Sequence, residues 1–135
     1  MNDSNFQKEA ENVGYLVIRV STARGAIPLE NAAVSVKGNS PETSGIVYSM
    51  TTDRDGLTQK ISLPAPAKAL SGSPGNSQPF STWNIDVFKD GYVPVRFQNV
   101  PVYSSIVSVQ PAVLVPAPEN FIVPEVYNES ENPDL

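Results

Sequence analysis

The sequence predicts an all-β domain built as a sandwich of about seven short strands. Apolar and polar residues alternate with a period of two in several short segments, which is typical of strands with one buried face. Asp-Gly turn signals separate neighbouring segments at the spacing that sandwiches show. No long stretch has the periodicity of an amphipathic helix, so we expect no long helix.

The first half of the chain contains four predicted strands, at 15–20, 32–37, 46–52 and 57–63. Their alternate apolar residues would face one core. The sequence Asp53-Arg54-Asp55-Gly56 separates the last two strands and predicts a tight turn, because glycine tolerates the positive φ that such turns need. We expect the Asp53 carboxylate to fold onto the backbone of this turn.

The second half contains three or four predicted strands. Segments 83–87 and 93–97 alternate around a second turn, Lys89-Asp90-Gly91, and 106–115 gives one or two short strands around Pro111. The alternation places one tryptophan on the apolar face, so we predict that it packs in the core. The alternative is an aromatic platform for sugar rings, formed by Trp83, Tyr92, Phe97 and Tyr103.

Composition divides the chain into a sandwich and three other segments. We expect a polar arm at 1–13, the sandwich at 14–116 and an acidic, proline-containing tail at 117–135. Within the sandwich, 64–79 is rich in Pro, Ala, Ser and Gly and reads as a long insertion between two strands. The arm, the tail and the insertion are therefore candidates for contact with a partner.

The charge and the missing residue types exclude several classes of function. The net charge is −5 and the nine basic residues are scattered, which argues against nucleic acid and against an anionic membrane surface. Neither cysteine nor histidine occurs, so thiolate chemistry, histidine-bound zinc and a Ser-His-Asp triad are impossible in this chain alone. We see no signal peptide and no membrane span, and expect synthesis in the cytoplasm.

Four motifs occur in the order found in the carboxypeptidase regulatory-like domain. Over residues 14–116 the chain resembles this family through Gly25–Val36, Thr52–Gly56, Val87–Tyr92 and Val113–Pro116. The resemblance implies a seven-stranded Greek-key β-sandwich of the transthyretin (prealbumin) type. It specifies a fold and hardly an activity.

A narrower resemblance concerns domains of spore-forming clostridia. The segments Thr22–Pro28, Leu63–Ser71 and Asn99–Val102 are similar to domains that precede peptidoglycan-binding modules in spore cortex-lytic-type proteins. This resemblance implies a link to the cell wall or the spore.

Carboxylates offer two further interpretations, neither of which we favour. Asp53 and Asp55 resemble the opening of a calcium loop, but the downstream ligand spacing and the bidentate glutamate are missing, so a hairpin turn is the better interpretation. A glycosidase-like pair would need two of the 14 acidic residues in one cleft, and no stretch indicates a cleft.

We therefore predict a structural or protein-interaction module that is not an enzyme and uses no cofactor and no metal. It would bind a protein partner, or further copies of itself, in a bacterial surface, spore or phage-like assembly. The alternative is a peptidoglycan- or glycan-binding accessory domain. An enzyme that uses only Asp, Glu, Ser, Thr, Tyr or Lys is the third hypothesis. The candidate partner-binding residues are Pro64, Pro66, Leu70, Tyr103, Phe121 and Tyr127.

Overall fold

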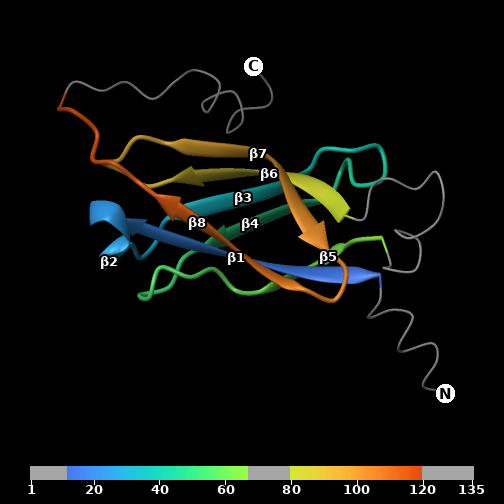
Figure 1. Ribbon diagram of the computed structural model, residues 1–135. Coiled ribbons are helices and arrows are strands. Elements are labelled where there is room, and N and C mark those ends of the chain that lie inside the picture. Colours follow the sequence, from blue (N-terminus) through green and yellow to red (C-terminus); the bar gives the residue numbers. More distant parts are fainter. Residues whose placement is uncertain (1–11, 67–79, 120–135) are drawn as a thin grey trace.

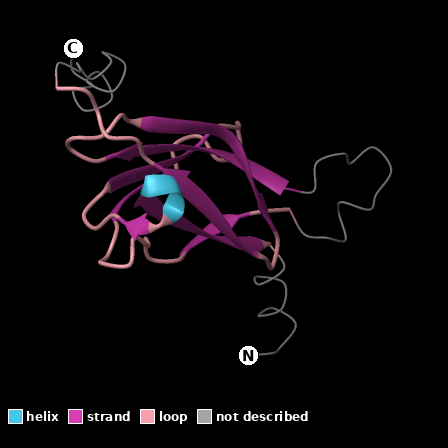
Figure 2. Ribbon diagram, turned by 60° about the vertical axis from the view of Figure 1, so that its left-hand side comes forward, coloured by secondary structure: helices cyan, strands magenta, loops and turns pink. Residues whose placement is uncertain are grey.

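Two β-sheets face each other in the computed structural model, which describes residues 12–66 and 80–119 (Figures 1 and 2). The described residues contain no α-helix, only a short 3₁₀ turn, η1 (Ala23–Gly25), and no helix in them is long and apolar enough to span a membrane. The predicted all-β class and the two-sheet arrangement are confirmed. The strands are β1 (Val13–Thr22), β2 (Ile27–Pro28), β3 (Ala33–Gly38), β4 (Val47–Thr51), β5 (Ile61–Pro64), β6 (Phe80–Phe88), β7 (Val95–Tyr103) and β8 (Val107–Val113).

The first sheet is organised around β1. Strand β8 lies parallel to β1 along one side, with Tyr15 opposite Val107. Strands β2 and β5 lie antiparallel to β1 along the other side, at its two ends. Between β2 and β5 the chain forms one isolated antiparallel β-bridge with β1, from Leu57 to Arg19. The sequence had predicted a continuous strand there, over 57–63.

The second sheet is antiparallel, in the order β4-β3-β6-β7. Its strands come from both halves of the chain, and β3 and β6 form its centre. Strand β4 is therefore one edge of this sheet and β7 is the other. Strand β5 belongs to the first sheet and β6 to the second, so the two strands that follow each other along the chain lie in different layers.

The core lies between the sheets and is formed by alternate residues of the long strands. Trp83 is fully buried, and its indole N–H donates to the Ser81 hydroxyl at 2.8 Å. This confirms that the tryptophan packs in the core and rules out a role for it in an exposed platform. The largest fully buried side chains are those of Trp83, Leu16, Ile18, Leu63, Ile85, Leu114, Val20, Val34, Val36, Val87 and Val102.

An asparagine cluster accompanies a bend in the β6–β7 pair. The register shifts between Trp83 and Ile85, so that Gln98 and Asn99 of β7 lie opposite Asn84 alone and form a bulge in β7. The Asn84 side-chain oxygen accepts from the Asn99 backbone N–H at 3.2 Å and from the Asn39 side chain at 3.0 Å. Bulges bend a strand, and the second half of β7 here swings toward the first sheet (Figure 1). Strand β7 therefore continues to Tyr103, beyond the predicted segment 93–97.

The Asp53–Gly56 turn has the predicted local design, but it connects the two sheets and is not the turn of a hairpin, because β4 and β5 lie in different sheets. The Asp53 carboxylate accepts from the backbone N–H groups of Asp55 at 2.9 Å and Leu57 at 3.0 Å, which confirms that it folds onto the turn. Gly56 has φ +79° and its carbonyl accepts from the Val20 N–H at 2.7 Å. The turn is therefore tied directly to β1.

Candidate functional site

Strand β4 has an open side. Among the described residues it pairs with β3 alone. The hydrogen bonds from Gly38 N–H to the Ile46 carbonyl and from Thr52 N–H to the Ala32 carbonyl, both 3.0 Å, show that even-numbered residues face β3. Because antiparallel strands alternate in the direction of their backbone groups, the N–H and C=O groups of Val47, Ser49 and Thr51 point to the open side.

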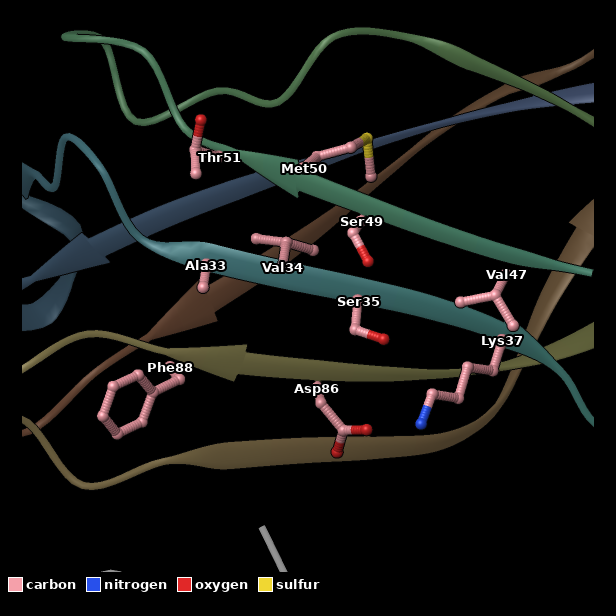
Figure 3. Close-up of a pocket in the computed structure, with 10 residues that line it drawn as sticks. All are labelled: Ala33, Val34, Ser35, Lys37, Val47, Ser49, Met50, Thr51, Asp86 and Phe88. Atoms are coloured by element: carbon pink, nitrogen blue, oxygen red, sulfur yellow. The ribbon is translucent and has the colours of Figure 1, made fainter. Parts of the chain in front are cut away.

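A hollow of about 730 Å³ lies on the outer face of the second sheet, beside this edge (Figure 3). Ala33, Ser35 and Ser49 form a floor of small side chains where β3 and β4 pair. Phe88 and Lys37 stand at opposite ends of the floor, as Figure 3 shows. The lining residues are Ala33, Val34, Ser35, Lys37, Val47, Ser49, Met50, Thr51, Asp86 and Phe88.

The charges of this hollow are partly paired. Asp86 accepts from the Arg96 guanidinium, with Nε 2.5 Å from Oδ1. The Lys37 side chain extends over the sheet on the same face as Asp86 (Figure 3). The hollow therefore presents an aromatic ring, small hydroxyl groups and a cation within one surface, which suits an amphipathic ligand.

A second hollow of about 450 Å³ flanks the same edge on the side toward the first sheet. It shares Ser49, Met50 and Thr51 with the outer hollow. Its other lining residues belong to the turn and the segment that follows it: Asp53, Leu57, Thr58 and Gln59. The β4 edge thus borders two hollows, and it shares the second with the turn at Asp53 and the segment that follows it.

This arrangement suits the addition of a strand. An extended peptide beside β4 would pair with the outward backbone groups, and its successive side chains would point alternately to the two faces. Every second side chain would enter the outer hollow, and the others would enter the hollow near Asp53. Main-chain pairing would supply affinity, and the two hollows would supply selectivity.

Three of the predicted partner-binding residues lie at another end of the sandwich. Pro64 and Pro66 line a hollow of about 640 Å³ at the base of the 64–79 insertion. Phe80, also in its lining, makes an edge contact with the Tyr103 ring, with the ring centroids 5.3 Å apart. The structure thus brings Pro64, Pro66 and Tyr103 to one region, where Tyr103 is 37% exposed.

Leu70, Phe121 and Tyr127 lie outside the described residues. The β4 edge was not singled out from the sequence, although the strand itself was predicted at 46–52. Alternation identifies a strand with one solvent-exposed face, but it gives no information on which strands lie at the edge of a sheet. That depends on the order of strands in space.

The calcium interpretation of Asp53 and Asp55 finds no support in the geometry. One oxygen of Asp53 is already engaged by two backbone N–H groups of the turn. In the described part of the chain, no three carboxylates gather into a group that could hold a metal ion.

Comparisons with known proteins identify the fold. No protein-family model matches the chain, and no curated protein is significantly similar to it. Among solved structures, catechol 1,2-dioxygenase from an Acinetobacter species matches with a TM-score of 0.57 at 14% identity, over 84% of this chain and 57% of that one. Chlorocatechol 1,2-dioxygenase from Pseudomonas putida matches with 0.52 at 16% identity, over 78% of this chain and 61% of that one. The Bacillus anthracis TIE protein matches with 0.52 at 17% identity, over 78% of this chain and 17% of that one.

These neighbours correct one prediction. We expected that the chain is not an enzyme, and that prediction is contradicted, because several of the matched structures are catechol or chlorocatechol dioxygenases. Identities of 12–16% show the fold alone, and this chain spans only part of those proteins. A β-sandwich of this kind thus accommodates proteins of different function. The resemblances to carboxypeptidase regulatory-like and clostridial domains remain predictions from the sequence.

Proposed function

We propose that this chain is a protein-interaction module whose β4 edge takes an extended segment of a protein partner as an additional strand. The observation that carries the proposal is the pair of hollows that flank β4 and share Ser49, Met50 and Thr51. An open edge alone is a general feature of sandwiches. An edge with recesses for alternate side chains is what strand-addition sites use to select a sequence.

The two hollows define the chemistry of the partner segment. Side chains entering the outer hollow would meet Phe88, Lys37 and small hydroxyl residues, which favours apolar or acidic groups there. Side chains entering the other hollow would meet Asp53, Thr58 and Gln59, which favours polar or basic groups. We therefore expect a partner segment in which apolar or acidic residues alternate with polar or basic ones.

Replacing one outward amide tests the proposal. Ser49→Pro removes an N–H on the open side of β4 and leaves the ladder to β3 intact, because proline is tolerated at edge positions whose N–H faces solvent. Ser49→Ala, which keeps the N–H, is the matched control. Both variants are first compared with the wild type by thermal unfolding, so that a change in the fold is recognised.

The probe is a decapeptide selected on the wild-type protein from a displayed random library. Titration calorimetry should show that Ser49→Pro weakens binding by about tenfold or more, which corresponds to about 1.4 kcal/mol, while Ser49→Ala stays within about threefold. Equal binding by the folded proline variant would refute the β4 site. Failure of the library to yield any binder with the expected alternation would also count against it.

Light scattering tests whether the added strand comes from a second copy of this chain. If copies join through β4, the mass of the wild type rises above 14.5 kDa with concentration and the Ser49→Pro variant stays at the monomer mass. A monomer at all concentrations leaves a different protein as the partner. The placement of such a module in a surface, spore or phage-like assembly is part of the same proposal and is supported by the composition of the two terminal segments and, for the spore, by the clostridial resemblance.

A further inference from the structure

The solvent face of β8 is unusually apolar. Val107, Val109 and Val113 are 51%, 52% and 46% exposed, whereas Ser108 and Gln110 point inward and are half-buried. An ordinary edge strand of a sandwich has the opposite alternation, apolar inward and polar outward. We call Val107, Val109, Val113 and Val115 the valine stripe.

The apolar surface continues from the valine stripe onto β1. Tyr15 is in register with Val107, and Val17 with Val109, so the four side chains share the outer face of the first sheet. Tyr15 and Val17 are only half-buried. Contiguous exposed apolar surface of this kind marks a face that another segment covers.

Strand β8 is also an open edge. Among the described residues it pairs with β1 alone, so its other side has backbone groups available for a further strand. Long apolar edges promote aggregation, and natural sandwiches cover them or interrupt them. Here the covering segment has to supply apolar side chains on the outer face as well as backbone pairing.

The chain itself provides such a segment directly after β8. Residues 121–127, Phe-Ile-Val-Pro-Glu-Val-Tyr, number seven, as many as β8 has. In an extended strand Phe121, Val123, Glu125 and Tyr127 share one face. That face matches the valine stripe in length, and three of its four side chains are apolar or aromatic.

The path of the chain brings this segment within reach. The Val93 N–H donates to the Val115 carbonyl at 2.9 Å, and the Ala117 N–H donates to the Gly91 carbonyl at 2.8 Å, so the chain crosses from β8 to the β6–β7 turn. Four extended residues after Ala117 span about 13 Å. Two packed sheets are about 10 Å apart, so a return to the end of β8 by residue 121 is feasible.

We propose that residues 121–127 of the same chain lie antiparallel along β8 and cover the valine stripe. A chain that turns back on the preceding strand is antiparallel to it, and a short connection gives an effective concentration in the millimolar range, which favours the same chain over a second copy. The tail is acidic and has neither Lys nor Arg, while Arg19 and Lys60 are exposed on and beside this face. Covering β8 would remove one open edge and leave β4 accessible, although the two proposals rest on different observations.

Hydrogen exchange measured by mass spectrometry tests whether residues 121–127 cover β8. In the full-length wild-type protein we expect the amides of 121–127 to exchange at least about tenfold more slowly than the intrinsic rate of an unstructured peptide. The double variant Val109→Glu/Val113→Glu should abolish this protection and leave the exchange of β3 and β6 unchanged. Val47→Glu makes one such substitution at a residue that is 54% exposed on the other sheet and should leave the tail protected.

Three outcomes would overturn the proposal. The first is exchange of 121–127 at the intrinsic rate in the wild type. The second is protection that survives the double variant. The third is protection that appears only as the protein concentration rises, together with a doubled mass in light scattering, because the cover would then come from a second copy. Since Ser49 lies on the other sheet, the Ser49→Pro experiment and this one fail independently.

Discussion

Gly56 should be far less replaceable than another glycine of the same backbone conformation. Its φ of +79° lies in the left-handed region, where an L-residue costs about 1–2 kcal/mol. In addition, a Cβ on Gly56 would lie 2.4 Å from the Val20 carbonyl oxygen and 3.2 Å from the Pro28 Cβ. Relief of that contact requires the turn to move away from β1, which weakens the 2.7 Å hydrogen bond from Val20 N–H to the Gly56 carbonyl, worth about 0.5–1.5 kcal/mol net. We therefore expect Gly56→Ala to lower the free energy of unfolding by about 3 kcal/mol.

Gly91→Ala is the matched control. Gly91 has φ +88°, but a Cβ there would meet no atom within 4 Å among the described residues. This variant should lose only the conformational cost of about 1–2 kcal/mol. Urea unfolding followed by tryptophan fluorescence measures both, because Trp83 is buried in the core. Equal losses for the two variants would refute the view that the turn is held by its close approach to β1.

Three further substitutions test the packing and the surface. Thr52→Val should lower the free energy of unfolding by about 2–4 kcal/mol, because the buried hydroxyl both donates to and accepts from backbone groups. Thr51→Val, at the exposed neighbouring residue, should change it by less than about 0.5 kcal/mol, and chemical unfolding of both variants measures the difference. Trp83→Phe should lower the free energy of unfolding by about 1–3 kcal/mol through the lost hydrogen bond and the cavity. Circular dichroism measures it, because the fluorophore is gone, and a loss below about 0.5 kcal/mol would contradict the place of Trp83 in the core. Arg96→Ala should lower the free energy of unfolding by less than about 1 kcal/mol, and by still less in 1 M salt, because the ion pair of Arg96 with Asp86 is partly exposed. A larger loss that does not change with salt would contradict this.

Local patterns were sufficient to predict most strands. Leu16, Ile18 and Val20, and Trp83, Ile85 and Val87, are buried as their alternation indicates, because a pleated strand with one buried face needs an apolar residue at every second position. The Asp53–Gly56 turn was predictable for a similar reason, since its hydrogen bonds and its positive φ involve neighbouring residues only. Strand β7 was longer than predicted, because its bulge at Gln98 and Asn99 and the contacts among Asn39, Asn84 and Asn99 involve residues far apart in the sequence.

The candidate sites illustrate the limit of local patterns. Pro64 and Pro66 were identified by composition, and they do line a hollow. The β4 edge was missed, because Ser49 reads as an ordinary outward residue until β4 is known to have a neighbour on one side only. The apolar outward face of β8 was also visible in the sequence as alternating valines, but alternation is unchanged when the two faces are exchanged.

The sequence by itself determined the all-β class, the approximate strands, the turns and the absence of cysteine and histidine chemistry. These follow from interactions between near neighbours and from residue types, so they need no knowledge of the fold. The tertiary structure decided the order of the strands, the edges that stay open, the hollows beside β4 and the outward direction of the β8 valines. Each of these depends on contacts between distant segments, which packing of the whole chain selects and which no single stretch encodes.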